Sequence, residues 1–188
     1  MLSIVIPTLN EEKNIEITLS KIEKISKLIE LEVIIVDDNS QDSTLKKIQA
    51  YMSKISINII NNKINLGLGY ALTRGYDSSK YPFVIFLDAD LSISKEDILK
   101  LYKSRKDNSI IIGSRYIFGS KIKGANKLKV LVSYCLNYII GKIFNLKIID
   151  ISHSFRIISK KIEIKTKNYT HPGFFWEMTV NAKRKNKT

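Results

Sequence analysis

The stretch Phe83-Val-Ile-Phe-Leu-Asp88-Ala-Asp90 is an apolar run that ends in two carboxylates one residue apart. Side chains alternate along an extended chain, so Asp88 and Asp90 are expected to point to the same side. The carboxyl ends of buried parallel strands are where α/β proteins hold ligands. Carboxylate oxygens suit Mg²⁺ or Mn²⁺. The stretch therefore predicts a strand followed by a divalent-metal site, although Asp-x-Asp by itself is also typical of a solvated loop.

Four further apolar runs have the length of buried strands: Leu2–Ile6, Val33–Val36, Ile57–Ile60 and Ile110–Ile112. Between them, apolar residues recur at helical spacing over 15–29 and 43–52. This alternation predicts an α/β fold with a mostly parallel central sheet flanked by helices. A chain of 188 residues with 44% hydrophobic content suits one domain. We place it at residues 1–182, followed by a basic tail at 183–188 that we expect to be disordered.

Cysteine and histidine are scarce in this chain. Cys135 is the only cysteine, which excludes an intramolecular disulfide and a cysteine-based zinc cluster and favours a reducing cytoplasm. His153 and His171 are too few for a zinc site. The first seven residues lack the basic region of a signal peptide, and no run of about 18 apolar residues predicts a membrane-spanning helix.

Positive charge is concentrated in the second half. Residues 1–94 carry 10 basic and 12 acidic side chains, whereas residues 95–188 carry 21 basic and 6 acidic ones, for a net charge of +13. Such a field suggests an anionic partner: nucleic acid, anionic lipid or a phosphorylated acceptor. A general enrichment in lysine would explain part of the charge without a partner.

Two apolar segments of the second half each allow two interpretations. Residues 126–147 predict a helix that is either buried or lies at a membrane surface, and we favour the buried helix. Phe174, Phe175 and Trp176 belong either to the core or to an interfacial anchor, and we favour the core.

Polar motifs flank the predicted strands in a fixed order: Pro7–Glu12, Val36–Thr44, Asn65–Gly75, Asp88–Asp90 and Gly113–Tyr116. In order and spacing they resemble the family 2 glycosyltransferases of GT-A fold, across almost the whole chain. The resemblance implies a single Rossmann-like GT-A domain that acts on a nucleotide-sugar.

Three segments narrow the resemblance: Ser114-Arg-Tyr116, Lys129–Ser133 and Asp150–Arg156. They are similar to those of the polyprenyl-phosphate sugar transferases, such as dolichyl-phosphate mannose synthase. The resemblance implies an inverting enzyme that moves mannose or glucose from GDP-mannose or UDP-glucose to dolichyl or undecaprenyl phosphate. Such an enzyme would associate peripherally with a membrane and would not bind nucleic acid.

The resemblance also implies roles for individual residues. Asp88 and Asp90 would hold Mg²⁺ or Mn²⁺ and Arg115 would bind phosphate, so these three are the candidate catalytic residues. Ser92 stands where several relatives have glutamine, which implies a more hydrated metal. The candidate substrate-binding residues are Pro7, Thr8, Asn10, Glu11, Asp37, Asp38, Gly67, Gly69, Lys129, Ser133 and Arg156. Asp37 and Asp38 are equally typical of residues that cap the following helix.

Two rival functions remain at this point. A family 2 transferase with a sugar hydroxyl as acceptor would need a general base, for which Asp150 or Glu177 is available. A non-catalytic nucleic-acid-binding module would fit the basic charge. Acidic clusters at the ends of the predicted strands argue against the second.

Overall fold

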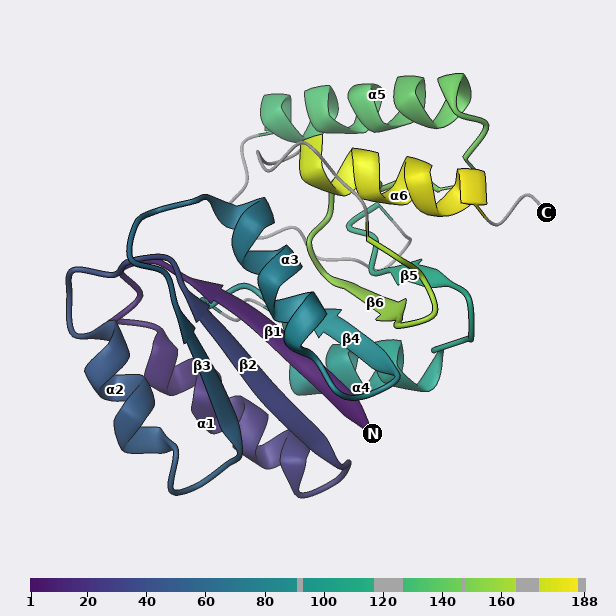
Figure 1. Ribbon diagram of the computed structural model, residues 1–188. Coiled ribbons are helices and arrows are strands. Elements are labelled where there is room, and N and C mark those ends of the chain that lie inside the picture. Colours follow the sequence, from purple (N-terminus) through teal and green to yellow (C-terminus); the bar gives the residue numbers. More distant parts are fainter. Residues whose placement is uncertain (91–92, 117–126, 147, 165–172, 186–188) are drawn as a thin grey trace.

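The computed structural model describes residues 1–90, 93–116, 127–146, 148–164 and 173–185, with the backbone alone at 127–129 and 185. The elements are β1 (Leu2–Thr8), α1 (Ile15–Ser26), β2 (Leu31–Asp37), α2 (Thr44–Tyr51), β3 (Ile57–Asn61), α3 (Leu68–Ser78), β4 (Phe83–Phe86), α4 (Lys95–Lys103), β5 (Ile110–Ile112), α5 (Lys127–Ile143), β6 (Arg156–Ser159) and α6 (Gly173–Lys185). They form one α/β domain around a single sheet (Figure 1). The predicted fold class and all five predicted strands are confirmed.

The sheet has the strand order β3-β2-β1-β4-β6-β5. The first four strands in this order are parallel, whereas β6 runs antiparallel to both of its neighbours. Arg156, at the start of β6, pairs with Phe86 at the end of β4 and with Ile112 at the end of β5. The loops that follow β1 to β5 and the segment that precedes β6 therefore meet at one edge of the sheet, which we call the carboxyl edge.

Helices cover both faces of the sheet. Alternating residues of β1 divide between the two sides: Ile4 belongs to the core cluster beneath α1, α2 and α4, and Val5 belongs to the cluster beneath α3 and α6. Gly75 of α3 lies so close to β1 that a Cβ there would be 2.3 Å from Val5 Cγ1. A glycine is required at this point because the helix packs directly on the strand.

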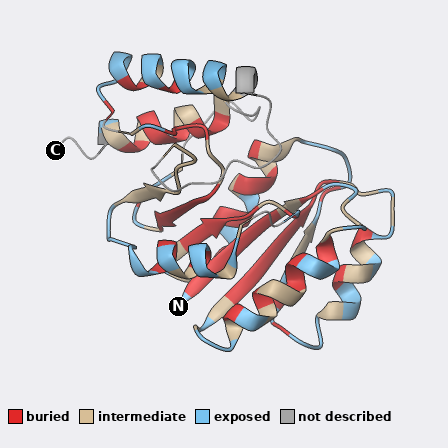
Figure 2. Cartoon of the chain, turned by 180° about the vertical axis from the view of Figure 1, so that it is seen from behind, coloured by how far each residue is buried: buried red, intermediate tan, exposed pale blue. Residues whose placement is uncertain are grey.

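The two apolar segments of the second half have different outcomes. Phe174 and Phe175 are fully buried, as predicted. The prediction of a buried helix at 126–147 was wrong: α5 lies outside α6, and its outer side is exposed (Figure 2). Among the described residues, Ile140 of α5 belongs to a small hydrophobic cluster with Leu146 and Trp176. The spacing of apolar residues predicts a helix, but it does not reveal whether another element covers those residues.

The C-terminal helix differs from the expected tail. α6 continues to Lys185, so residues 183–185 are helical, and residues 186–188 lie outside the described part. In the portion of the chain that the structure describes, no helix combines the length and the apolar character needed to cross a membrane.

Candidate active site

The loops that follow β1 and β2 are hydrogen-bonded to each other. The backbone N–H of Glu12 donates to Asp42 Oδ2 (3.1 Å), and the N–H of Ser43 donates to Glu12 Oε2 (3.0 Å). Asn10 Oδ1 accepts from the N–H of Gln41 (2.8 Å). The loop with the expected nucleobase contacts, Pro7, Thr8, Asn10 and Glu11, is therefore fixed by the loop beside it.

Asp37 and Asp38 are buried and accept hydrogen bonds from the chain itself. Asp37 accepts from the Thr8 hydroxyl (3.2 Å) and from the N–H of Ser40 (2.9 Å). Asp38 accepts from the side-chain amide of Asn62 (2.7 Å). Neither carboxylate caps α2 in these contacts; each connects a strand end to a loop. Their expected contact with a nucleotide stays a prediction.

Asp38 also fixes the loop before α3. Its carboxylate accepts from the backbone N–H groups of Leu66 (2.9 Å) and Gly67 (2.8 Å). Gly67 precedes α3 with a φ of 89°, a conformation that favours glycine. Gly69 is buried in the first turn of the helix. The two candidate glycines thus lie at the start of α3, where the buried Asp38 fixes the preceding loop.

Asp88 and Asp90 follow β4 at the carboxyl edge. Asp88 is half-buried and accepts a hydrogen bond from the Ser154 hydroxyl (2.8 Å), and Asp90 is exposed. The described residues contain no group of three or more metal-ligating side chains. Two carboxylates nevertheless fit Mg²⁺ or Mn²⁺, which bind through one or two protein oxygens and complete their shell with water and phosphate. Ser92 lies outside the described residues.

Arg115 and Asp150 form a bidentate ion pair. Arg115 donates from Nε to Asp150 Oδ2 (2.9 Å) and from Nη2 to Oδ1 (2.8 Å), and its backbone N–H also donates to Oδ2 (2.9 Å). Asp150 is fully buried, whereas 37% of the Arg115 side chain is exposed. The hydrogen bonds that Arg115 donates to Asp150 raise the pKa of Arg115. The guanidinium is held in one orientation at the surface of the site.

Arg156 is buried beneath this pair. Its guanidinium donates to the carbonyl oxygens of Ile151 (2.8 Å) and His153 (3.1 Å, from Nε) and to the Thr179 hydroxyl (3.0 Å). Burial lowers its pKa to about 9, which leaves it charged at pH 7. We expected Arg156 to contact phosphate, but here it has no exposed surface. It positions the segment 150–155 because its donors satisfy carbonyl groups of that segment.

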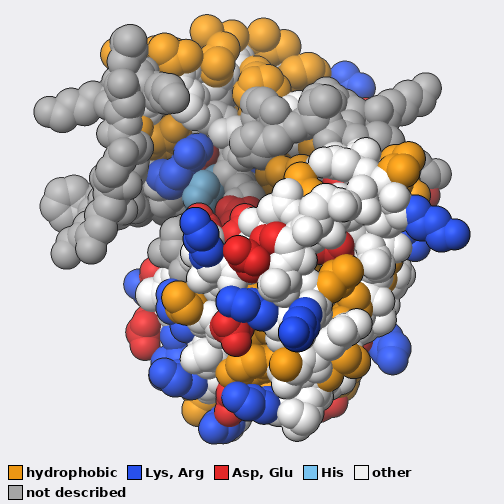
Figure 3. Space-filling model, turned by 90° about the vertical axis from the view of Figure 1, so that its left-hand side faces the viewer, with side chains coloured by type: hydrophobic (Ala, Val, Ile, Leu, Met, Phe, Trp, Pro, Cys, Tyr) orange, Lys and Arg blue, Asp and Glu red, His pale blue; other side chains and the backbone are white. Residues whose placement is uncertain are grey.

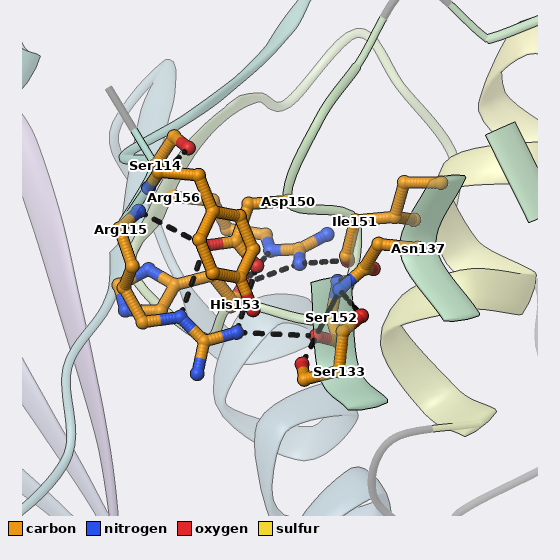
Figure 4. Close-up of polar contacts among 10 residues, drawn as sticks. Ser114, Arg115, Ser133, Asn137, Asp150, Ile151, Ser152, His153 and Arg156 are labelled. Carbon is orange, nitrogen blue, oxygen red and sulfur yellow. Dashed lines mark hydrogen bonds and ion pairs between the residues drawn. The ribbon is translucent and has the colours of Figure 1, made fainter. Parts of the chain in front are cut away.

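Asn137 connects α5 to the same segment (Figure 4). It accepts from the N–H of Ser152 (3.1 Å) and donates to Ser152 Oγ (3.1 Å) and to the carbonyl oxygen of Ser133 (2.8 Å). Ser152 Oγ in turn accepts from Arg115 Nη2 (3.4 Å). The candidate Ser133 is therefore linked to Arg115 through Asn137 and Ser152, whereas the Lys129 side chain lies outside the described residues.

Sequence reasoning missed Asn137, Ser152 and Ser154. The signal for Asn137 was present, because it is a polar residue inside an apolar helical run. Ser152 and Ser154 carried no comparable signal, since short hydroxyl side chains are common in any loop.

His153 belongs to the segment that contacts Arg115 through Asp150 and Asp88 through Ser154. Burial lowers its pKa, as do the charges of Arg115 and Arg156, while Asp150 and Asp88 act in the opposite direction. Within the described part of the chain, its Nδ1 atom is buried without a hydrogen-bond partner. Figure 3 shows acidic side chains grouped beside basic ones in the hollow at this end of the molecule. The site can therefore hold a cation and an anion next to each other.

An open α/β sheet with such groups at the carboxyl ends of its strands is typical of a nucleotide-binding enzyme. Residues 3–166 match the family described as Glycosyl transferase family 2. The chain belongs to this family. The resemblance found in the motifs is confirmed.

Two relatives with named activities are similar to this chain. The chain is 36% identical over 132 residues to the dolichol-phosphate mannosyltransferase of Pyrococcus furiosus, covering 70% of this chain and 38% of the relative. It is 28% identical over 167 residues to the dodecaprenyl-phosphate galacturonate synthase of Rhizobium johnstonii, covering 86% and 48%. The chain thus spans less than half the length of these two proteins.

Solved structures confirm the GT-A fold. The glucosyl-3-phosphoglycerate synthase of Mycobacterium tuberculosis, in complex with Mn²⁺, UDP and phosphoglyceric acid, has a TM-score of 0.71 at 18% identity, covering 94% of this chain and 61% of that one. S. aureus TarS in complex with UDP-GlcNAc has a TM-score of 0.63 at 22% identity, covering 96% and 53%.

Proposed function

We propose that this chain transfers mannose or glucose from GDP-mannose or UDP-glucose to a polyprenyl phosphate, dolichyl or undecaprenyl, with inversion at the anomeric carbon. The relatives named as dolichol-phosphate mannosyltransferase and dodecaprenyl-phosphate galacturonate synthase support this acceptor class. The reaction would take place at a membrane surface, where such an acceptor resides.

One contact network carries the proposal: segment 150–155 touches both Arg115 and Asp88. Asp150 holds the guanidinium, and Ser154 donates to the carboxylate of Asp88. A phosphate-binding group and a metal-binding group therefore belong to one hydrogen-bonded unit. A reaction between two phosphate-bearing substrates requires such an arrangement, because their negative charges must be balanced side by side.

The residues divide the chemistry between them. A divalent cation held by Asp88 and Asp90 would neutralise the diphosphate of the departing nucleotide. Arg115 orients an anionic phosphate through its planar donors. A lipid monophosphate has a second pKa of about 6 and attacks as an anion, so no dedicated general base is needed.

The state of Asp150 favours this acceptor over a sugar hydroxyl. A hydroxyl acceptor needs a general base, and Asp150 was one of two candidates for that role. It is fully buried and bound to Arg115 through both oxygens, which removes it from contact with substrate. The other candidate, Glu177, is half-buried on α6 and has interactions of its own.

The test is sugar transfer to a short polyprenyl phosphate in detergent, with Mn²⁺ and either GDP-mannose or UDP-glucose. Asp90→Asn should lower turnover by about 10²–10³-fold, because one metal-binding charge is lost. The matched control is Asp107→Asn, which removes a carboxylate that is 59% exposed and pairs with Lys161; its turnover should be unchanged. Transfer to a saccharide but not to the lipid would contradict the proposal.

A further inference from the structure

Ala89 stands between the two candidate metal ligands and is anchored in the core. Its side chain is buried and belongs to the same hydrophobic cluster as Leu19 of α1. On either side of it, Asp88 is half-buried and Asp90 is exposed. We call residues 88–90 the Asp-Ala-Asp turn. The middle of this turn is therefore fixed in the interior, while the two carboxylates lie nearer the surface.

Thr18 of α1 binds the main chain of the Asp-Ala-Asp turn. Thr18 is fully buried, and its hydroxyl donates a hydrogen bond to the carbonyl oxygen of Ala89. A threonine inside a helix commonly donates to a carbonyl group of its own helix, as Thr73 of α3 does to Gly69 (2.8 Å). The hydroxyl of Thr18 donates outside its helix instead, so it stabilises the turn and not α1.

Ser154 binds the same turn from another part of the fold. It belongs to the segment before β6, and its hydroxyl donates to Asp88 Oδ2 (2.8 Å). Thr18 therefore holds the main chain of the turn, and Ser154 sets the orientation of one of its carboxylates. Two hydroxyl groups from separate elements fix the position of the candidate metal ligands.

The start of α1 is also bonded to the loop that is expected to contact the nucleobase. The N–H of Ile15 donates to the carbonyl oxygen of Glu11 (2.9 Å), and the side-chain amide of Asn14 donates to Glu11 Oε2 (2.9 Å). The N–H of Thr18 in turn donates to the carbonyl oxygen of Asn14 (3.0 Å). One helix thus holds both the loop after β1 and the turn after β4 in place.

We propose that Thr18 is a positioning residue for the divalent cation and acts through the main chain of Ala89. Its hydrogen bond keeps Asp88 and Asp90 in a fixed relative orientation before the cation binds. Mg²⁺ and Mn²⁺ are bound through few protein oxygens, and Mg²⁺ requires near-ideal octahedral geometry, so a displaced carboxylate weakens binding. The inference rests on the proposed function, in which these two carboxylates hold the cation.

Binding of Mn²⁺ alone tests this role without substrate or turnover, because the electron paramagnetic resonance signal of the free ion is lost on binding. Thr18→Val keeps the shape of the side chain but removes the hydroxyl, so Mn²⁺ affinity should fall about tenfold. Thr18→Ser keeps the hydroxyl and should bind Mn²⁺ like the wild type. A role in core packing alone predicts the opposite ranking, because valine fills the volume of threonine and serine does not.

Three further variants complete the experiment. Thr18→Ala also lacks the hydroxyl and should weaken Mn²⁺ binding as Thr18→Val does, which keeps the test available if valine disturbs the helix. Ser154→Ala should lower the affinity about tenfold through Asp88. The matched control is Ser26→Ala, which removes from α1 a hydroxyl that donates to the carbonyl oxygen of Glu23 (2.8 Å). Its Mn²⁺ affinity should be unchanged, and circular dichroism checks that each variant is folded.

Equal Mn²⁺ affinity in the wild type, Thr18→Val and Thr18→Ala would overturn the proposal. Asp90→Asn separates this outcome from failure of the proposed function. If Asp90→Asn abolishes Mn²⁺ binding and the Thr18 variants do not weaken it, the metal site stands and the positioning role of Thr18 is wrong. If Asp90→Asn binds Mn²⁺ like the wild type, the carboxylates do not hold the cation, and both proposals are wrong.

Discussion

The loops that follow β1, β2 and β3 and the segment that precedes β6 reach the same edge of the sheet, but different chemistry holds them in place. In the first region, buried carboxylates accept hydrogen bonds from neighbouring loops, as Asp38 does from Leu66 and Gly67. In the second, a buried guanidinium donates to carbonyl groups of the segment, as Arg156 does to Ile151. The first half of the chain is nearly neutral and the second strongly basic.

This difference indicates how the two regions contribute to one site. Buried carboxylates in the first region fix the loops that are expected to contact the base and ribose of the nucleotide. The second region presents an exposed guanidinium above a second, buried cation, which suits a phosphate. If this comparison is correct, substitutions in the two regions should have separable effects.

The largest effect is expected from Arg156→Met. The substitution keeps an unbranched side chain but leaves carbonyl groups of Ile151 and His153 without their donor in the interior. We expect the free energy of unfolding to fall by about 3–5 kcal/mol. Chemical denaturation measures the change.

Lys161→Met is the control for Arg156→Met. Lys161 is 60% exposed and pairs with Asp107 at the surface, so its loss should cost less than about 1 kcal/mol. If Arg156→Met were as stable as this control, the segment before β6 would not depend on its buried cation, and the comparison between the regions would fail.

A smaller loss is expected from Asp38→Ala, on the other side of the site. The N–H groups of Leu66 and Gly67 and the amide of Asn62 would lose their acceptor, which we expect to cost about 2–3 kcal/mol. Nucleotide affinity, measured by calorimetry with GDP or UDP and Mn²⁺, should fall because the loop before α3 is released.

Arg115→Lys tests the second region and is compared with Asp38→Ala in the same measurements. It retains a positive charge but loses the bidentate contact with Asp150, so the KM for the lipid acceptor should rise several-fold. Nucleoside diphosphate affinity should change less than in Asp38→Ala. Equal losses of nucleotide affinity in the two variants would show that the regions do not divide the substrates.

Local sequence patterns predicted most of the fold. Five strands were visible because each is a short apolar run, and parallel strands buried on both faces have this pattern. β6 was missed because its four residues begin with Arg156 and end with a serine, so the run lacks the apolar ends of the others. It is a strand because it completes the sheet between β4 and β5, which is a tertiary effect.

The sequence predicted where the site lies in the fold better than it predicted what each residue does there. Asp88, Asp90 and Arg115 reach the carboxyl edge as expected, because strand order and motif order agree. The buried state of Arg156 was not predictable, since a basic residue in a loop motif has the same sequence pattern whether it faces substrate or carbonyl groups. The exposure of α5 was missed for a related reason: the pattern of a helix does not reveal whether its partner belongs to the chain.

The smallest expected effect is a change in how the unfolding free energy depends on pH, and it tests the electrostatics of the second region. Because burial lowers the pKa of His153, the unfolded chain binds more protons than the folded protein at a pH between the lowered value and 6.5. The stability that neutral His153 contributes is complete above pH 6.5 and is lost as the pH falls through this window. His153→Gln should therefore make the unfolding free energy less dependent on pH between 7 and 5. Measurement at pH 8, where the imidazole is neutral in both states, isolates the packing change. An unaltered slope would show that burial does not lower the pKa of His153 in the folded protein.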